Sequence, residues 1–244
     1  MDHEDTEKGK ALPSGGESVQ DPQTSSDKSV ADALIPQNSR AMICSSTIIW
    51  KEMSTVSCWE PSCPPIVSRE EWGARLPKKR QDLTTPVPLV IIHHTYSPPA
   101  CHSLEDCKKA LVEIQNFHMN DRGWDDIAYN FLVGDEYLFM GRGWQTVGAH
   151  AKGFNNNSIG ICFIGDYREE IPSPRMLILG SALIKFGIDN HFISANYKLI
   201  GHRQVRNTEC PGEAFYNVIK TAPSWGPMDN SPSPSNVTGN QGGS

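Results

Sequence analysis

The chain has 244 residues, of which 22 are lysine or arginine and 28 are aspartate or glutamate, so its formal net charge is −6 at pH 7. The two signs of charge are interspersed without a basic nucleic-acid footprint, and we therefore expect no nucleic-acid partner. No apolar run approaches the roughly 20 residues that a helix needs to cross a bilayer, so we expect no membrane span.

Composition divides the chain into one apolar-rich middle and two polar ends. Residues 1–40 are rich in serine, glycine and charged residues and contain no aromatic residue. Such a segment cannot bury enough apolar surface to offset the entropy of ordering it. We predict a disordered or weakly ordered segment over residues 1–60, one compact domain over 61–225 and a disordered tail over 226–244.

The first elements of this domain are a buried strand and a helix. Residues 87–92, VPLVII, form a continuous apolar run that ends in His93 and His94, as in a strand buried on both faces. Ser103 is a good helix N-cap, with an acidic residue three positions later. Apolar residues then recur at helical spacing as far as Phe117, so we expect a helix there.

The remaining elements continue the alternation of strand and helix. Residues 128–144 predict two strands around a Gly-Asp-Glu turn, and residues 158–166 predict a further buried strand. Ser173 followed by Pro174 predicts the start of a second helix. Residues 198–202 return to a strand, and residues 211–220 predict a third helix.

This order of elements predicts an α/β fold in which helices cover both faces of a mixed central β-sheet. In such sheets, ligands bind beyond the ends of the strands. His93 and His202 each follow an apolar strand, so we expect both at the edge of the sheet where sites are built.

The seven cysteines have different contexts. Cys101 and Cys107 enclose a short loop and a helix start, close enough for a local disulfide in an oxidising compartment. Cys162 is typical of a small, buried strand residue. A second bridge could come from the three cysteines that precede the core, Cys44, Cys58 and Cys63. Cys210 then requires a different explanation.

His93, His202 and Cys210 together form a set of ligands that Zn²⁺ accepts readily. Three protein ligands leave a fourth position for water, which is the arrangement of a catalytic zinc site, and amide hydrolysis is a natural chemistry for it. Each residue also has a plain structural explanation. A histidine at a strand end is often only hydrogen-bonded, and Cys210 could be half of a disulfide. Ordinary surface or supporting roles also remain open for His94, His118 and His150.

Several ordered segments of residues 67–222 strongly resemble the peptidoglycan recognition protein family, specifically its amidase-type insect members. They are SREEWGAR, VIIHHTYS, IQNFHMNDRGWDDIAYNFLVG, GRGWQTVGAHA, NNNSIGICFIGDY and GHRQVRNTECPG, together with the spacing of Cys101 and Cys107. The resemblance implies the fold of the type 2 N-acetylmuramoyl-L-alanine amidases.

The resemblance also implies a set of catalytic residues. The family holds zinc with residues that match His93, His202 and Cys210, and non-catalytic members typically carry serine in place of this cysteine. A tyrosine and a threonine or lysine of the family match Tyr129 and Thr208. The phenol can stabilise the developing oxyanion, and the hydroxyl can hold the attacking water or polarise the same oxygen.

The activity implied is hydrolysis of the amide between N-acetylmuramic acid and L-alanine in peptidoglycan and muropeptides. Family members that bind diaminopimelate carry the features matched by Gly123, Trp124 and Arg142, and an arginine can grip the additional carboxylate in a two-pronged contact. The alternative for Arg142 is a solvated turn residue. Further candidates for the substrate groove are His94, Thr95, His118, Arg122 and His150.

Two other classes of function stay open beside the amidase. One is a non-catalytic receptor that binds peptidoglycan, which loss of Cys210 or Tyr129 would favour. The other is a zinc-independent antibacterial effector, for which we expect a more cationic chain. We expect a monomer. If the chain is an amidase, the resemblance to insect members implies that it trims immunostimulatory fragments and so dampens the host's immune response.

The sequence gives two conflicting indications of whether the protein is secreted or intracellular. The family is usually secreted, which agrees with a disulfide between Cys101 and Cys107 and would make Asn236 a glycosylation acceptor. The polar N-terminus, however, lacks the basic start and apolar middle of a signal peptide, which an intracellular isoform or an unconventional start to the reading frame would explain.

Overall fold

The computed structural model describes residues 66–228. The predicted segment 1–60 and most of the predicted tail 226–244 lie outside the described residues, as do Cys44, Cys58, Cys63 and Asn236. Among the described residues, no helix is both long and apolar enough to cross a membrane.

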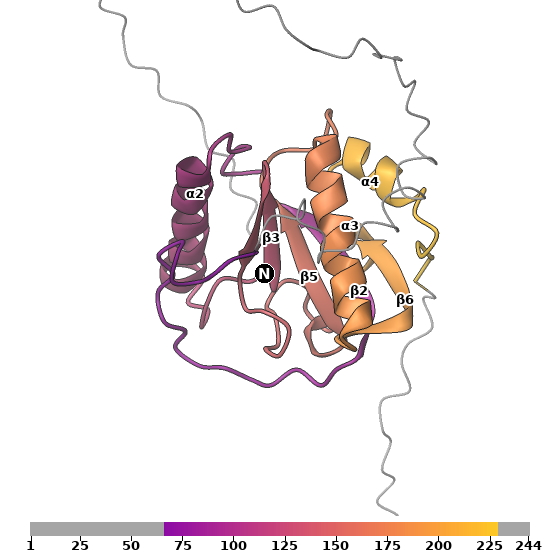
Figure 1. The fold of residues 1–244 in the computed structure, drawn as a ribbon, viewed down its shortest axis with the longest axis horizontal. Coiled ribbons are helices and arrows are strands. Elements are labelled where there is room, and N and C mark those ends of the chain that lie inside the picture. Colours follow the sequence, from indigo (N-terminus) through magenta and orange to yellow (C-terminus); the bar gives the residue numbers. More distant parts are fainter. Residues whose placement is uncertain (1–65, 229–244) are drawn as a thin grey trace, which may run out of the picture. The chain divides into compact units, whose positions relative to one another are not determined.

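A six-stranded mixed sheet forms the centre of the fold, as predicted (Figure 1). Its strands lie in the order β1-β4-β3-β5-β2-β6, and only β3 and β4 pair antiparallel, as the two arms of the predicted hairpin. The strands are β1 (Ile66–Val67), β2 (Val87–His94), β3 (Phe131–Gly134), β4 (Tyr137–Met140), β5 (Ser158–Phe163) and β6 (Ile193–Gly201).

The three predicted helices are present, and two of them begin at the predicted caps. They are α2 (Leu104–Asn116), α3 (Pro174–Asp189) and α4 (Glu213–Ile219). The Ser103 hydroxyl accepts a hydrogen bond from the backbone N–H of Asp106 at 3.1 Å, and Ser173 accepts one from Met176 at 3.2 Å. Each bond satisfies an N–H that the first turn of a helix leaves without a partner.

The end of α2 differs from the prediction. The helix ends at Asn116, and residues Phe117–Asp121 form a single turn of π-helix, η1. The wider turn exposes 44% of Phe117 and buries His118. The Arg122 guanidinium lies over the Phe117 ring, 5.1 Å from its centre. Helical spacing could not predict this, because the period of the chain changes at Phe117.

Alternate strand residues supply apolar clusters on the two faces of the sheet. Phe131 and Val133 of β3 pack in a cluster with Leu179 and other residues of α3 and α4. Leu132, between them in sequence, packs in a second cluster with Leu111 and other residues of α2. Helices therefore cover both faces of the sheet, as predicted (Figure 1).

The register of the parallel strands decides where the functional side chains meet. Ile92 of β2 pairs with Gly201 of β6, so the residues that follow, His93 and His202, are brought to the same edge of the sheet. On its other side, β2 places His93 opposite Cys162 of β5. Three carboxyl-terminal strand ends thus lie side by side, the usual position for a ligand site in an α/β sheet.

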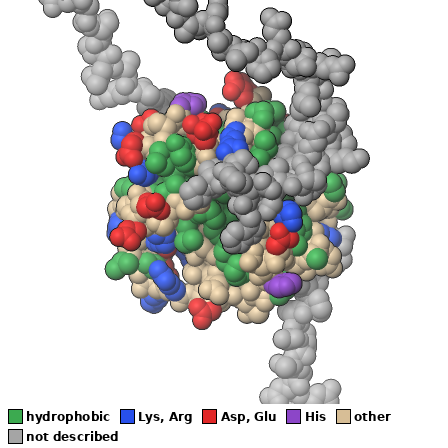
Figure 2. Space-filling model, viewed as in Figure 1, with side chains coloured by type: hydrophobic (Ala, Val, Ile, Leu, Met, Phe, Trp, Pro, Cys, Tyr) green, Lys and Arg blue, Asp and Glu red, His purple; other side chains and the backbone are tan. Residues whose placement is uncertain are grey.

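On the face of the molecule seen in Figure 2, basic and acidic side chains are intermingled, as they are along the sequence.

Candidate metal centre

The structure brings His93, His202 and Cys210 together. One ligand atom from each residue lies within 4.8 Å of the other two. His93 lies at the end of β2, His202 opens the 3-10 turn η3 (His202–Gln204) after β6, and Cys210 lies in the loop before α4. The Cys210 Sγ is 3.8 Å from His93 Nδ1, and the centres of the two histidine rings are 4.4 Å apart. Cys210 is a free thiol, so the disulfide alternative for it is wrong.

These residues fit a zinc ion. In a tetrahedral site with Zn–N of about 2.0–2.1 Å and Zn–S of about 2.3 Å, nitrogen and sulfur ligands lie about 3.5 Å apart, close to the distance between His93 and Cys210. His202 Nε2 is buried and has no hydrogen-bond partner among the described residues. Because an unpaired buried polar atom is costly, a cation bound by this nitrogen would satisfy it.

Burial sets the protonation of the three residues. It is the main reason why the pKa of His93 lies well below 6.5 and the pKa of His202 falls to about 4. Both rings are therefore neutral at pH 7, as metal ligation requires. Burial also raises the pKa of Cys210 to about 12, although the backbone N–H of His94 donates to its sulfur at 3.4 Å. Metal binding must then displace a proton from the thiol.

A cavity of about 480 Å³ opens over these residues. It brings together most of the residues predicted from the sequence, namely His93, His94, Thr95, His118, Trp124, Tyr129, His150, His202, Thr208 and Cys210. Five further lining residues were not predicted: Tyr96, Ala128, Ala149, Arg168 and Glu209. The signal for Arg168 was available, because it follows the β5 strand end closely, where a sheet of this kind places its ligands.

Tyr129 and Thr208 both face the cavity. The Tyr129 ring lies 5.3 Å from the His93 ring, and burial, followed by the nearby thiols of Cys162 and Cys210, raises the pKa of its phenol well above 10. The phenol therefore keeps its proton and can donate it in a hydrogen bond. The Thr208 hydroxyl accepts the backbone N–H of Cys210 at 3.2 Å, which leaves its own hydrogen for another acceptor.

His118 and His150 are both buried in the wall of the cavity. His118 stacks on Trp124 with the ring centres 4.9 Å apart, and its Nδ1 accepts the backbone N–H of Ala128 at 3.1 Å. The Nδ1 of His150 lies 3.0 Å from Nε2 of His93. Burial lowers the pKa of His118 to about 4 and that of His150 to about 3.

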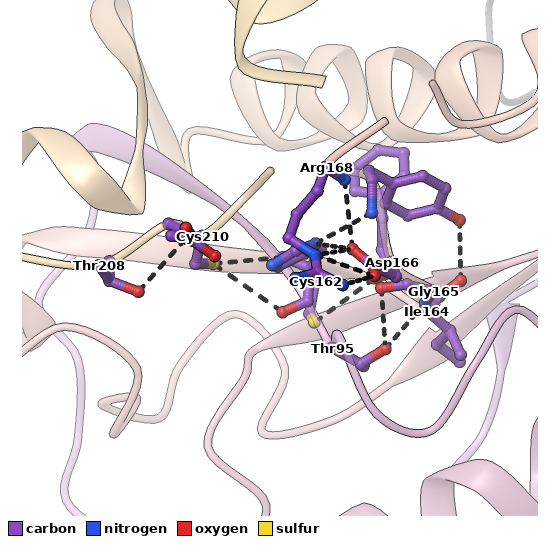
Figure 3. A network of polar contacts seen from close by, with 12 residues as sticks. Thr95, Cys162, Ile164, Gly165, Asp166, Arg168, Thr208 and Cys210 are labelled. Atoms are coloured by element: carbon purple, nitrogen blue, oxygen red, sulfur yellow. Dashed lines mark hydrogen bonds and ion pairs between the residues drawn. The ribbon is translucent and has the colours of Figure 1, made fainter. Parts of the chain in front are cut away.

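Figure 3 shows a polar network between the ends of β2 and β5 at the rim of the cavity. The Thr95 hydroxyl donates to Pro98 O at 2.8 Å and accepts the N–H of Gly165 at 2.8 Å. Arg168 donates to both carboxylate oxygens of Asp166, and this contact holds the pKa of Asp166 below its ordinary value. Thr95 therefore already has structural hydrogen bonds in addition to its place in the cavity wall.

The predicted specificity residue Arg142 lies in an adjacent groove of about 440 Å³, which it lines with Gly123. This groove shares Trp124 and Ala149 with the metal cavity. Arg142 donates to the backbone oxygens of residues 126, 127 and 147 at 3.4, 2.6 and 2.8 Å. It is thus half-buried and anchored, not a solvated turn residue. Arg122 is exposed and does not line either space.

Cys101 and Cys107 form the predicted disulfide. The bridge joins the loop that follows β2 to the first turn of α2. Cys162 is fully buried and free, as predicted.

Comparisons with known proteins agree with these features. Residues 83–213 match a family model described as N-acetylmuramoyl-L-alanine amidase. The Drosophila melanogaster protein named peptidoglycan-recognition protein LB is 47% identical over 159 residues, which cover 65% of this chain and 68% of that protein. A Mus musculus N-acetylmuramoyl-L-alanine amidase is 39% identical over 172 residues, which cover 69% of this chain and 32% of that protein.

Solved structures show the same likeness. The wild-type structure of Drosophila PGRP-LB has a TM-score of 0.67 at 45% identity, covering 68% of this chain and 99% of that one. The structure of peptidoglycan recognition protein LE has a TM-score of 0.66 at 39% identity and covers 67% of this chain and 96% of that one. That protein is in complex with tracheal cytotoxin, a monomeric diaminopimelic acid-type peptidoglycan.

Proposed function

Because the chain belongs to the peptidoglycan recognition protein family and carries its amidase domain over residues 83–213, we propose that it is a zinc-dependent N-acetylmuramoyl-L-alanine amidase. Its substrate would be bacterial peptidoglycan and the muropeptides derived from it. The observation that carries the proposal is the meeting of two neutral imidazoles, one buried and one half-buried, and one free thiol under an open cavity. A closed structural zinc site would need a fourth protein ligand.

In this proposal, His93, His202 and Cys210 hold the metal. A zinc ion there supplies Lewis acidity, which activates water and polarises the carbonyl oxygen of the amide. Tyr129 donates a hydrogen bond to the oxygen on which negative charge develops, and its raised pKa keeps the proton available at neutral pH. Thr208, two residues before Cys210, positions the attacking water or the same oxygen with its hydroxyl hydrogen.

Arg142 supplies the preference for diaminopimelate in the third position of the stem peptide. A guanidinium has five N–H groups, and backbone oxygens engage three of those of Arg142, so two remain for a carboxylate. The anchoring bonds hold the side chain in place before the ligand arrives, which lowers the entropic cost of binding. The groove of Arg142 meets the metal cavity at Trp124, so one peptide can occupy both.

The competing proposal is a receptor that binds peptidoglycan without cleaving it. The free thiol of Cys210 favours the hydrolase, because a binding protein has no need of a third metal ligand. As an amidase, the protein would separate stem peptides from the sugar and so dampen the immune response that the intact fragments cause. The disulfide between Cys101 and Cys107 fits the secreted form better than an intracellular one.

The test uses purified protein, the metal-stripped protein and the Cys210→Ser variant. Each is incubated with diaminopimelate-type and lysine-type peptidoglycan while released stem peptides are counted. We expect release only from the metal-loaded native protein, and more from the diaminopimelate type. Equal release from all three samples would refute the proposal of a zinc-dependent amidase. Equal release from both substrates would remove only the specificity. Binding without any release would establish the receptor.

A further inference from the structure

His93 uses its two ring nitrogens in two directions. Its Nδ1 faces the Cys210 sulfur at 3.8 Å, and its Nε2 faces Nδ1 of His150 at 3.0 Å. Both histidines are almost fully buried, with exposed fractions of 1% and 7%. His150 comes from a segment 57 residues further along the chain. The second contact is therefore a tertiary one, made inside the protein.

The role of Nδ1 of His93 decides the direction of the hydrogen bond between His93 and His150. If Nδ1 of His93 is the metal ligand, its lone pair is used there and the ring proton must sit on Nε2. A buried N–H needs an acceptor. Among the described residues, His150 Nδ1 is the only hydrogen-bond partner of His93 Nε2. His93 then donates to His150, whose own proton must be on Nε2, a buried atom with no hydrogen-bond partner among the described residues.

The fold holds the His150 ring in a fitted space. A Cβ atom added at Gly148 would lie 2.4 Å from its Cδ2, and one added at Gly160 would lie 2.4 Å from Cδ2 and 2.5 Å from Cγ. Real Cβ atoms do not come this close to other atoms, so neither position could carry a side chain unless the ring moved. The two glycines thus create the room that the imidazole fills.

The backbone of His150 is anchored as well. Its N–H donates to the Asn155 side-chain oxygen at 3.0 Å, and the N–H of Ala151 donates to the same oxygen at 2.8 Å. Asn155 begins the short turn that leads directly into β5, the neighbour of the strand that carries His93. The packing of the ring and the hydrogen bonds of the main chain therefore both hold Nδ1 of His150 next to β2.

We infer that His150 is a positioning residue of the metal centre: it accepts the His93 Nε2 proton and so keeps Nδ1 of His93 free and aimed at the metal. The inference rests on the proposed zinc site. It gives His150 a role through His93 in place of the substrate contact expected from the sequence. Outer partners of this kind orient a ligating histidine, and losing them typically weakens metal binding about 10–100-fold.

The test compares two substitutions of His150 by their zinc dissociation constants, measured by competition with a chromogenic chelator. In His150→Asn, the side-chain oxygen takes nearly the place of Nδ1 and can accept the same proton. His150→Leu fills a similar volume but accepts nothing. We expect about 10–100-fold weaker zinc binding for leucine and a substantial recovery for asparagine. His150→Ala replaces the leucine variant if that one does not fold.

His118→Leu is the matched control, because His118 is a buried histidine of the same cavity whose Nδ1 meets a backbone N–H instead of a ligand. It should bind zinc as the native protein does. An equal loss in His118→Leu and His150→Leu, or a loss in His150→Asn as large as that in His150→Leu, would overturn the inference. Unchanged zinc affinity in His150→Leu would do the same.

The absorption spectrum of the cobalt-substituted protein gives a second readout that does not depend on turnover. If His150 orients His93, the His150→Leu spectrum should change in band position or intensity, and the His150→Asn spectrum should match the native one. Failure of the native protein to bind zinc would contradict the proposed function itself. Native binding with unaffected His150 variants would contradict only this inference.

Discussion

Arg142 has two proposed roles, which are to hold nearby backbone oxygens and to bind the carboxylate of diaminopimelate. Replacing it by methionine keeps much of the length of the side chain and removes every N–H, and separate assays then measure the loss of each role. The backbone oxygens of residues 126, 127 and 147 then lose their donor. A hydrogen bond to a charged group contributes about 1.5–3 kcal/mol. The two bonds of 2.6 and 2.8 Å supply most of this contribution to the unfolding free energy, and the contact of 3.4 Å adds little. Since water can partly replace the guanidinium, we expect a loss of about 3 kcal/mol in unfolding free energy.

Urea denaturation measures this loss. With a slope of about 2 kcal/mol per molar urea, a loss of about 3 kcal/mol lowers the unfolding midpoint by about 1.5 M. Arg122→Met is the matched control, because it removes an exposed guanidinium that lies over Phe117. Its midpoint should change by less than about 0.3 M. An unchanged midpoint for Arg142→Met would refute the anchoring role of the three hydrogen bonds.

Calorimetry with muropeptides measures the second role of Arg142, the binding of the diaminopimelate carboxylate. Binding is compared in the Cys210→Ser background, where we expect no cleavage, for stems with diaminopimelate or lysine in the third position. Loss of a two-pronged contact to a carboxylate should weaken diaminopimelate binding about 10–100-fold, at about 1.4 kcal/mol for each factor of ten. Lysine-type binding should change little. An equal loss for both ligands would refute the carboxylate contact.

Four further outcomes are expected. Zinc at about 100 times its dissociation constant should stabilise the native protein by about 2.7 kcal/mol in thermal unfolding, and Cys210→Ser should lose most of this gain. Tyr129→Phe should lower kcat about 10²–10³-fold in a stem-release assay and still bind zinc. Replacing both Cys101 and Cys107 by alanine opens a short closed loop and should cost about 2 kcal/mol in urea denaturation. In the metal-free protein, His118 has a pKa of about 4 when folded against 6.5, so its contribution to the unfolding free energy should be fully present above pH 6.5 and fall by up to about 3 kcal/mol towards pH 4. His118→Gln should make that fall shallower, and an identical pH profile would contradict the assignment.

The sequence was sufficient for the parts of the molecule that local pattern controls. The apolar run before His93 and the cap at Ser103 predicted a strand and a helix that the structure contains. The alternation of strands and helices was enough to predict that His93 and His202 share one edge of the sheet. Neighbouring parallel strands end on the same side, so no knowledge of side-chain contacts was needed.

Features that depend on contacts between distant segments could not be predicted in this way. The hydrogen bond between His93 and His150 joins two elements of unrelated local pattern, and glycines 148 and 160 look like ordinary loop and strand glycines. Arg142 was expected to bind a carboxylate, but its bonds to backbone oxygens depend on how two other segments pass beside it. Phe117 continues the helical repeat in sequence, while the chain itself changes to a wider turn there.

The position of β6 at the margin of the sheet has a consequence for how the proposed zinc ion would enter and leave its site. His93 hangs from β2, which is flanked by strands on both sides, whereas His202 and Cys210 follow β6, which has one neighbouring strand. Segments at a margin open locally at a lower free energy than the interior does. We therefore expect the ion to enter and leave when the segment after β6, which carries His202 and Cys210, opens locally. His93 on β2 should keep its position during this opening.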